Sequence, residues 1–468
     1  MIPALVTAAP AQRTREQIAQ RIAPVRSRTP DRASVRREGV RRVVHTTVGC
    51  ALLVVIANAW LVQGLTAPTV VVASGSMAPA LLGPHRAWLC SACGHYFRCS
   101  AESLPAPESM AVCTNCGTRQ ATEPGLDCEG DRVLVDRATL LLRAPRRWET
   151  VVFRDPRQAT AWCVKRVVGL PGEAVEIRGG EVVIDGRVAA KSPKELRTMA
   201  INVYDATMAD RRWQATEGGA WQAGEAATLY RHPASHDTEI DWLTYRHQHG
   251  FNPGASSAEV PILDESPVDQ AESRALDPVA DILLDCELQA AGEGEVLLRA
   301  GSTGNEFTAS LDVASGRGQL RHNSRTLASF SAGWYPLQVV RRVEFILADH
   351  RARLVLDGRI VAEQQYEPSA EPGTHVVAIG ARGAALEVRR LQILRDVHYT
   401  PGPPGGGSKH QLGPNEYYVL GDNSPHALDS RVASFGKGIS GDAIVGRAIR
   451  WRTHRARSTG PESGGGSL

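Results

Sequence analysis

The stretch Ala161-Trp-Cys-Val-Lys-Arg-Val-Val-Gly-Leu-Pro-Gly172, followed by Glu181-Val-Val-Ile-Asp-Gly186, indicates the fold class of this 468-residue chain. Each run is rich in valine or isoleucine, and each ends in turn-forming residues. β-Branched residues are enriched in strands, whereas Gly-Leu-Pro-Gly and Asp-Gly sequences are typical of turns. The stretch therefore predicts short strands of a mainly β fold.

Runs of the same kind lie before and far after this stretch. They are Val70–Ala73, Asp131–Asp136, Thr150–Phe153, Glu416–Leu420 and Ala443–Trp451. Residues 192–400 differ, because they hold longer alternating runs and an Asp357-Gly358 turn, which are typical of a β-sandwich. We therefore expect one domain split into residues 67–191 and 411–452, a sandwich inserted at 192–400, and a Pro/Gly-rich linker at 401–410.

Charge is distributed unevenly along the chain. The net charge is +3, but residues 1–42 hold ten arginines and three acidic residues, an excess of +7 that leaves −4 for the rest. Val43 to Pro84 contains no charged residue. This predicts a disordered basic tail at 1–42 that lies against anionic lipid, and a single membrane-spanning helix at 43–66.

The arginine-rich flank also predicts the orientation of the span. A one-sided excess of arginine holds that side in the cytoplasm, so the N-terminus would be cytoplasmic and the rest would lie outside the cytoplasmic membrane. The lipid bilayer is then a partner, and no nucleic acid is expected. A cleaved signal peptide and a buried soluble helix are the alternatives for residues 43–66. A second disordered tail is expected at 453–468.

Three segments contain residues suited to peptide hydrolysis. The first is Ser74-Gly-Ser-Met-Ala-Pro79, the second places Lys165 in Val164–Glu173, and the third is the turn-rich Tyr418–Arg431. A serine hydroxyl needs a base to remove its proton before it attacks a carbonyl. Lysine acts as that base only when burial lowers its pKa. Taken one at a time, each segment is more typical of an ordinary loop or a solvated strand than of a catalytic site.

In this order and behind a single span, the segments resemble the bacterial type I signal peptidase family. The matching motifs are the Ser-Gly-Ser-Met-x-Pro sequence, the Gly130–Val135 strand, the Lys-Arg-Val-Val-Gly-Leu-Pro-Gly sequence, and the Gly-Asp-Asn and Asp-Ser-Arg sequences at Gly421–Arg431. The resemblance covers Pro68–Leu82, Gly130–Lys191 and Gln411–Trp451. It implies a signal-peptidase-type β catalytic domain and cleavage of signal peptides from exported preproteins that carry small residues at positions −1 and −3.

The resemblance also implies roles for individual residues. Ser76 corresponds to the nucleophile and Lys165 to the general base, while the Ser74 hydroxyl and the Ser76 N–H would form the oxyanion hole. Asp429 and Arg431, with the intervening Ser430, match the residues that support the site, and catalysis would need no cofactor. The chain departs from the family where a serine that contacts the lysine is replaced by Ala427; the resemblance leaves Ser424, Ser430 or water to supply that hydroxyl.

Four cysteines form two closely spaced pairs within residues 87–120. Cys90-x2-Cys93 and Cys113-x2-Cys116 are each followed by glycine, and 19 residues separate them. Paired thiolates on tight turns can complete the tetrahedral coordination of zinc, so the spacing predicts a zinc ribbon with a structural zinc ion. Disulfide bonds are the alternative, because the expected compartment is outside the cytoplasm.

The inserted sandwich resembles concanavalin-like and laminin-G-like jelly rolls, chiefly through Asp349–Arg359 and Leu386–Val397. Such folds often bind glycans, so glycan or envelope polymer is considered as a partner, although a fold does not fix a function. The alternative function is accordingly a non-catalytic, membrane-tethered binding protein; a self-cleaving peptidase of the same chemistry is a third. Asp241, His247 and His249 suggest a metal site or, more simply, polar loop residues.

Overall fold

The structure, a computed structural model, describes residues 44–58, 68–104, 110–123, 125–206, 212–224, 228–236, 238–248, 259–270, 274–333, 337–368, 373–403, 407–432 and 435–452. The chain forms two compact units, Met1–Thr66 and Ala67–Leu468. In the first, residues 44–58 form a helix. Among the residues described, no helix combines the length and apolar character needed to cross a membrane. The expected span at 43–66 lies partly outside the described residues, and the expected tails at 1–42 and 453–468 lie wholly outside them.

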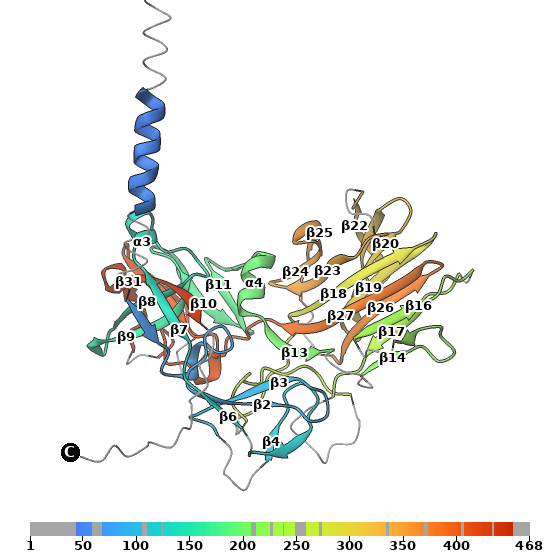
Figure 1. Cartoon of the computed structure of the whole chain (residues 1–468), viewed down its shortest axis with the longest axis horizontal. Helices are drawn as coiled ribbons and strands as arrows, with labels where there is room; N and C mark the ends of the chain where they lie inside the picture. Colours follow the sequence, from blue (N-terminus) through green and yellow to red (C-terminus); the bar gives the residue numbers. More distant parts are fainter. Residues whose placement is uncertain are drawn as a thin grey trace, which may run out of the picture. The chain divides into compact units, whose positions relative to one another are not determined.

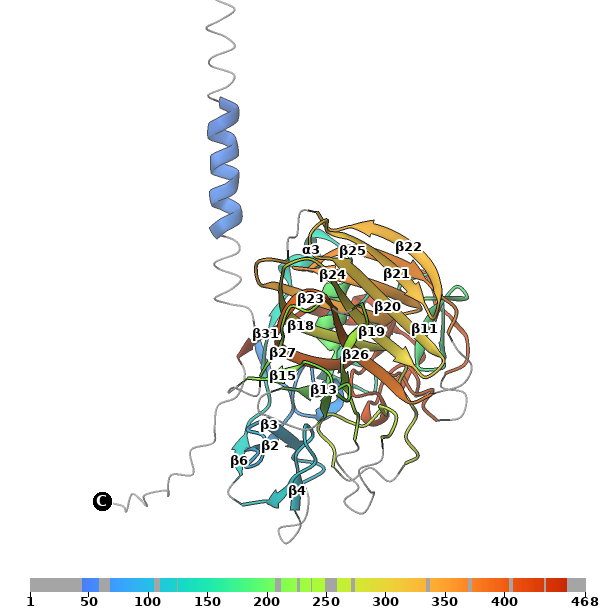
Figure 2. The ribbon, with the colours of Figure 1, turned by 90° about the vertical axis from the view of Figure 1, so that its right-hand side faces the viewer.

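The described residues of the second unit are mainly β, as the sequence predicts (Figures 1 and 2). Its first sheet, here called the core sheet, has seven antiparallel strands. In spatial order these are β1 (Thr69–Val71), β7 (Arg132–Asp136), β31 (Ile444–Arg452), β8 (Thr150–Asp155), β9 (Gln158–Gly169), β29 (Glu416–Leu420) and β30 (Ile439–Ser440). Strand β31 inserts between β7 and β8, so the last part of the chain completes a sheet that the earlier part began.

A smaller sheet packs beside the core sheet. It consists of β12 (Arg187–Val188), β11 (Glu181–Ile184), β10 (Ala174–Arg178) and β28 (His410–Gln411). The Asp185-Gly186 turn joins β11 to β12 with both residues at positive φ, 50° and 83°, and Asp357-Gly358 does the same in the sandwich at 47° and 81°. These are the dihedral signs of a two-residue hairpin turn, so both turns predicted from the sequence are confirmed.

Two small sheets carry the paired cysteines and are together called the ribbon. One consists of β3 (Tyr96–Ser100), β2 (His85–Leu89) and β6 (Leu126–Cys128), and the other of β4 (Met110–Val112) and β5 (Arg119–Ala121). Trp88 stacks on Phe97 with ring centroids 5.4 Å apart, and both contact the cysteine side chains. This core is small, since few apolar side chains other than the cysteines contribute to it.

Two large antiparallel sheets form a sandwich from residues 201–395. One contains β15 (Gln222–Ala223), β16 (Leu229–His232), β27 (Ala385–Arg395), β18 (Ile282–Ala291), β23 (Arg341–Ala348), β24 (Arg351–Leu356) and β25 (Arg359–Gln365), with β13 (Ile201–Asp205) on β27. The other contains β14 (Trp213–Ala215), β17 (Asp241–Tyr245), β26 (His375–Arg382), β19 (Glu295–Ser302), β20 (Asn305–Asp312), β21 (Arg317–His322) and β22 (Arg325–Ser331).

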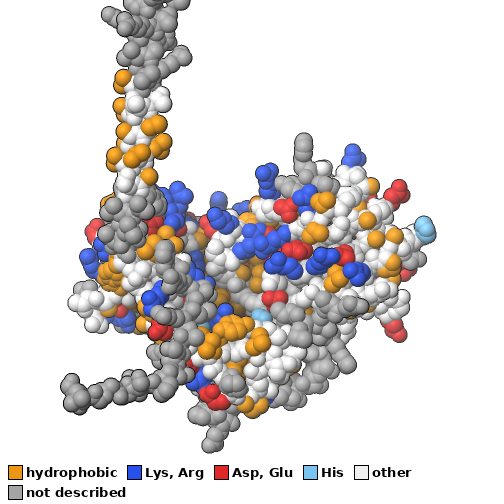
Figure 3. All heavy atoms as spheres, viewed as in Figure 1, with side chains coloured by type: hydrophobic (Ala, Val, Ile, Leu, Met, Phe, Trp, Pro, Cys, Tyr) orange, Lys and Arg blue, Asp and Glu red, His pale blue; other side chains and the backbone are white. Residues whose placement is uncertain are grey.

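Alternation explains how the sandwich closes. In β20, Phe307, Ala309 and Leu311 are buried while the residues between them are half-exposed. The inward side chains of both sheets form one continuous apolar core that includes Phe307 and Phe345. On the face seen in Figure 3, Lys and Arg side chains are interspersed with Asp and Glu. This is the in-and-out pattern of a sandwich with a solvated outer face.

A buried charged cluster joins the small sheet to the sandwich. Lys191, which follows β12, pairs with Asp349 and lies 2.7 Å from Asp396 Oδ2, while its ammonium lies 4.7 Å from the centre of the Trp148 ring. Helix α4 (Pro193–Met199) follows, with a capping box formed by Ser192 and Glu195. The other short helices among the described residues are α3 (Ala138–Leu142), η1 (Gly75–Met77), η2 (Ser424–His426) and η4 (Gly441–Ala443). The sandwich is thus attached through specific buried contacts.

The described residues of the expected linker at 401–410 also make contacts. The Ile177 N–H donates to Gly407 O at 3.1 Å, and His410 begins strand β28. A Cβ at Gly402 would lie 3.2 Å from the Arg431 side chain. The described residues of the linker thus contact the small sheet and the side chain of Arg431 in the third sequence motif.

Candidate active site

A serine hydroxyl and a lysine amine of the core-sheet region lie within hydrogen-bonding distance of each other. Ser76 lies in η1, which follows β1 after residues 72–74, and Lys165 lies in the middle of β9. Lys165 Nζ is 2.6 Å from Ser76 Oγ, within hydrogen-bonding distance. Among the described residues this is the one hydrogen bond that the amine makes. Two side chains that are 89 positions apart in sequence are therefore in direct contact.

The environment of Lys165 favours a neutral amine. The side chain is 5 % exposed, and burial lowers the pKa of Lys165 from its usual value, although the negative charges of Asp429 and Asp422 oppose that shift. A lysine that loses its proton readily can accept a proton from a neighbouring hydroxyl. The arrangement can therefore activate Ser76 as a nucleophile.

Ser74 lies on the other side of the Ser76 hydroxyl. Its Oγ donates to Ser76 Oγ at 3.2 Å, and both serines are half-buried. The segment that carries them packs closely against neighbouring backbone: a Cβ at Gly130 would lie 1.9 Å from Val72 O, and one at Gly421 would lie 2.4 Å from Ser76 O. Only glycine permits approaches this close, which explains two glycines of the sequence motifs.

Asn423 connects the third sequence motif to η1 (Gly75–Met77), here called the serine turn, by hydrogen bonds. Its backbone N–H donates to Ser76 O at 3.2 Å, and its side-chain Nδ2 donates to Gly75 O at 3.2 Å. The sequence suggested only a turn-forming role for this residue. Its side chain instead holds the backbone of η1, next to the residue that bears the hydroxyl.

Asp429 and Arg431 form a buried ion pair behind the lysine. Arg431 Nη2 lies 2.6 Å from Asp429 Oδ2, and the same carboxylate oxygen accepts from the Gly421 N–H at 2.9 Å. Arg431 also donates to Thr400 O at 2.7 Å and to Ser424 Oγ at 2.5 Å. The pair therefore holds the loop between β29 and η2 in a fixed conformation.

A second buried ion pair joins β9 to the same loop. Arg166, the residue after Lys165, lies 2.5 Å from Asp422 Oδ2 and donates to Trp148 O at 2.7 Å. Both side chains are almost fully buried. This contact fixes the strand that carries the lysine relative to the loop that carries Asn423, and no spacing rule in the sequence indicated it.

The Ser424 and Ser430 hydroxyls, which could replace the family serine that is absent at Ala427, make hydrogen bonds to groups other than Lys165. Ser424 Oγ accepts from Arg431 and from the Thr400 N–H, the latter at 2.9 Å, and Ser430 Oγ accepts from the Val419 N–H at 3.1 Å. Ala427 follows η2, and a Cβ at Gly421 would lie 2.4 Å from its Cβ. In the described part of the chain, neither serine side chain makes a hydrogen bond to Lys165.

The four paired cysteines converge in the ribbon. Their sulfur atoms all lie within 4.8 Å of one another, with Cys90 Sγ 3.5 Å from Cys116 Sγ and Cys93 Sγ 3.7 Å from Cys113 Sγ. Zn–S bonds of about 2.3 Å in a tetrahedron place sulfurs about 3.8 Å apart, whereas a disulfide needs about 2.05 Å. The four thiols therefore fit a tetrahedral metal ion.

The polar residues of the sandwich considered for a metal do not converge. Asp241 lies 3.2 Å from His232 Nε2, while the Nδ1 of His247 lies 3.0 Å from the Tyr245 hydroxyl. His249 lies outside the described residues. The groups of metal-ligating side chains found among the described residues do not include Asp241 or His247.

The site thus brings a serine hydroxyl into hydrogen-bonding contact with a buried lysine amine. Residues 114–228 match the family model described as signal peptidase, peptidase S26. A Signal peptidase I from Leptolyngbya laminosa is 37 % identical over 65 residues, which cover 12 % of this chain and 32 % of that protein. The matched region spans about a third of that relative's length. The family expected from the sequence motifs is therefore supported over part of the chain.

Two solved structures that align with part of the chain come from Bacillus subtilis. A carbohydrate binding module, CBM66, from Bacillus subtilis aligns with a TM-score of 0.26 and 10 % identity, over 40 % of this chain and 96 % of that chain. A Bacillus subtilis protein of unknown function with a galectin-like fold aligns with a TM-score of 0.28 and 11 % identity, over 42 % and 97 %. Scores this low carry no argument, so the sandwich is defined here by its own two sheets.

Proposed function

We propose that this chain is a membrane-anchored serine endopeptidase that removes N-terminal signal peptides from exported preproteins. The observation that carries the proposal is the 2.6 Å contact between Lys165 Nζ and Ser76 Oγ, formed by a lysine that is 5 % exposed. The match of residues 114–228 to the signal peptidase family model supports the substrate class. In this proposal Ser76 is the nucleophile and Lys165 is the general base.

The mechanism follows from the positions of these groups. Neutral Lys165 takes the proton of the Ser76 hydroxyl as Oγ attacks the scissile carbonyl, and the resulting ammonium protonates the leaving amine. Water then hydrolyses the acyl-enzyme, with Lys165 again accepting a proton. The negative charges of Asp429 and Asp422 oppose the lowering of the Lys165 pKa by burial. The same charges stabilise the ammonium that forms in both steps.

The oxyanion of the tetrahedral intermediate needs donors that are already in place. As the second residue of a 3-10 turn, Ser76 has its N–H among those that a helix leaves without an internal partner. Ser74 Oγ lies 3.2 Å from Ser76 Oγ and can redirect its proton to the oxyanion. These two donors would stabilise the charge where it develops.

The expected span at 43–66 would hold the site at the outer face of the cytoplasmic membrane. A preprotein reaches the enzyme with its own apolar signal segment in the same bilayer, which raises the effective concentration of the cleavage site. Val71 of β1 and Trp162 of β9 are 52 % and 39 % exposed and offer apolar surface to an extended peptide. We expect this surface to accept small side chains at positions −1 and −3.

Zinc completes the proposal as a structural component. Cys90, Cys93, Cys113 and Cys116 would hold the ion, and four thiolates leave it no open position for chemistry. Its contribution would be to stabilise the ribbon. Catalysis itself is assigned to Ser76 and Lys165.

The substrate class can be tested with one preprotein. We expect the purified full-length protein in detergent to cut a preprotein with alanine at −1 and −3 at a single bond, after the −1 residue. Replacing the −1 alanine with tryptophan should abolish the cut, since the proposed substrates carry a small residue at this position, next to Ser76 and Lys165 (the dyad). Mass spectrometry of the products identifies the bond. An intact preprotein, or a cut that ignores the −1 residue, would instead favour the binding-protein alternative or a protease of different specificity.

Cleavage should also depend on pH in one direction. Because burial lowers the pKa of Lys165, the neutral amine becomes populated at a lower pH than for an exposed lysine. Below that pKa the ammonium cannot accept a proton, and kcat/KM should fall about tenfold per pH unit; above it the rate should reach a plateau. Measuring kcat/KM over the range in which circular dichroism shows the protein folded tests this. A rate that continues to rise to the pKa of a free lysine would contradict it.

A further inference from the structure

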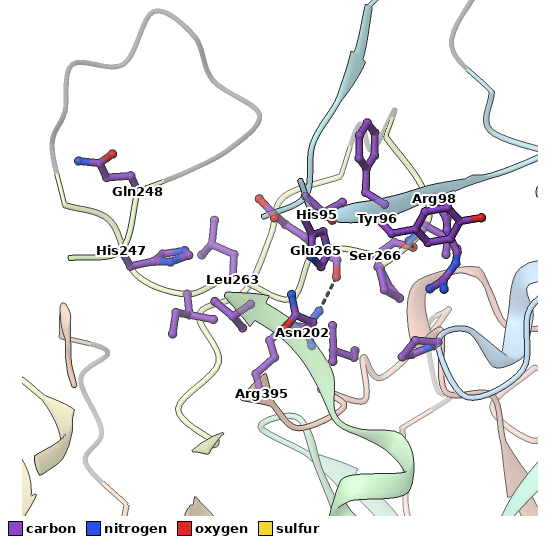
Figure 4. Close-up of a pocket in the computed structure, with 18 of the residues that line it drawn as sticks. His95, Tyr96, Arg98, Asn202, His247, Gln248, Leu263, Glu265, Ser266 and Arg395 are labelled. Carbon is purple, nitrogen blue, oxygen red and sulfur yellow. Dashed lines mark hydrogen bonds between the residues drawn. The ribbon is translucent and has the colours of Figure 1, made fainter. Parts of the chain in front are cut away.

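A segment of the insert lies against the back of the serine turn. Residues 262–270, here called the strap, leave the sandwich after Ile262, whose N–H donates to His375 Nδ1 at 3.0 Å. Figure 4 shows Leu263, Glu265 and Ser266 of the strap between the ribbon and β13. They line a cavity of about 120 Å³. Pro79 and Leu82, which follow the serine turn in sequence and are here called part of the serine segment (residues 74–82), also bound this cavity. The strap therefore lies where ribbon, sandwich and serine segment meet.

The far end of the strap is held by the ribbon. The Ser100 N–H donates to Val268 O at 2.7 Å, and Ser103 Oγ donates to the Asp269 carboxylate. Gln270 makes two hydrogen bonds to the backbone of Val112, at 2.9 and 3.0 Å. Both sheets of the ribbon therefore fix the position of Asp269.

The strap also contacts the serine turn directly. Val268 packs against Ala78 and Leu82, and a Cβ at Gly75 would lie 3.8 Å from it. Asp269 Oδ2 accepts a hydrogen bond of 3.0 Å from Asn423 Nδ2. The same amide nitrogen donates to Gly75 O, so its two protons join the carboxylate of the strap to the backbone of the turn that bears Ser76.

The two partners fix the orientation of the Asn423 amide. Gly75 O and the Asp269 carboxylate can only accept, so the nitrogen must face both of them. Burial alone would raise the pKa of Asp269, but hydrogen bonds from Ser103, Ser266 and Asn423, with the charge of His426, keep the pKa below its usual value. Asp269 is thus a carboxylate at neutral pH and a strong acceptor for Asn423.

We propose that Asp269 is a positioning residue for Ser76 that acts through Asn423, so that the inserted sandwich supplies part of the support of the dyad. The proposal rests on the function proposed above. Attack by a hydroxyl needs its oxygen placed to within a fraction of an ångström. Asn423 donates hydrogen bonds to the carbonyls of both Gly75 and Ser76. Among the described residues, Asp269 is the one other group to which the Asn423 side chain donates a hydrogen bond.

The test compares two isosteric substitutions in the same strap. Asp269→Asn removes the charge that Asn423 faces, whereas Asp264→Asn makes the same change in a buried carboxylate that is held by Arg274 and the Asp277 N–H. With full-length protein and the preprotein above, we expect Asp269→Asn to lower kcat about tenfold or more with KM almost unchanged. Asp264→Asn should cleave at a rate close to that of the wild type.

Two further measurements exclude a merely structural effect. If Asp269 acts through Asn423, adding Asp269→Asn to Asn423→Ala should lower kcat no further than Asn423→Ala alone. Amide exchange at Ala78 and Leu81, which donate to Gly75 O and Met77 O, should be faster in Asp269→Asn than in Asp264→Asn. Additive losses of kcat, or equal exchange in the two variants, would overturn the proposal. A wild type that leaves the preprotein intact while exchange still differs would refute the proposed function but not the contact.

Discussion

Replacing Lys165 with methionine is expected to abolish preprotein cleavage while the protein stays folded. Methionine has nearly the length of lysine and no amine. Among the described residues, only the Ser74 hydroxyl, which is not a base, would then remain within hydrogen-bonding distance of Ser76 Oγ. The site buries this side chain to 5 % exposure, and an apolar side chain costs less there than an amine. Loss of a residue that acts as a unit with the nucleophile should lower kcat by about 10³-fold or more.

Three related variants make the result specific to the dyad. Ser76→Ala should lower kcat as far as Lys165→Met, and the double variant should be no slower than either, because the two groups perform one step. Lys165→Arg keeps a positive charge but cannot lose its proton at accessible pH, so it should also be inactive. Cleavage is measured by product mass, and folding by the thermal melting curve. Residual activity in Lys165→Met that needs Ser76 would show that another base serves the serine.

The dyad was predicted from sequence only through the family resemblance. Ser76 and Lys165 are 89 positions apart and lie on different elements, and each motif taken alone is typical of a loop or a strand. What the sequence did indicate locally was confirmed: the Asp185-Gly186 and Asp357-Gly358 turns have the positive φ angles expected of them. Turn chemistry is encoded by adjacent residues, whereas a site is created by contacts between distant ones.

The residues that hold Ser76 and Lys165 in position could not be predicted from the sequence either, because they too act through contacts between distant parts of the chain. Asn423 sits in a Gly-Asp-Asn-Ser-Pro sequence that suggests a turn, and its side-chain contact with Gly75 O depends on where η1 packs. Asp269 belongs to the insert, outside every motif that resembles the family. The Arg166–Asp422 pair spans 256 positions. These contacts depend on the return of the chain to the core sheet after residue 411, which composition suggests but does not position.

Removing zinc is expected to unfold the ribbon and to reduce cleavage as a consequence. Strands β4 and β5 have three residues each, and such a hairpin is at best marginally stable by itself. A structural zinc ion contributes about 10 kcal/mol or more to folding in small zinc domains. The four sulfurs fit such an ion, so Cys113→Ser should lose bound zinc and leave β4 and β5 open to proteolysis.

The effect should reach the dyad through the strap. Val112, next to Cys113, makes both hydrogen bonds to Gln270, and Ser100 and Ser103 hold Val268 and Asp269. When these contacts are lost, Asp269 no longer has a fixed position opposite Asn423. We therefore expect Cys113→Ser to lower kcat about tenfold, as Asp269→Asn does, and the two changes together to lower it no further.

Cys128→Ser is the matched control, since Cys128 is a buried ribbon cysteine whose thiol donates to Leu126 O rather than joining the four-sulfur group. It should keep one zinc ion per chain, proteolytic resistance and cleavage. Metal content by atomic absorption and thiol titration in denaturant decide the chemistry of the cluster. Protein without metal that has lost the four thiols to oxidation would show that disulfides close the ribbon. Metal-free, reduced protein with full activity would show that the ribbon does not support the strap.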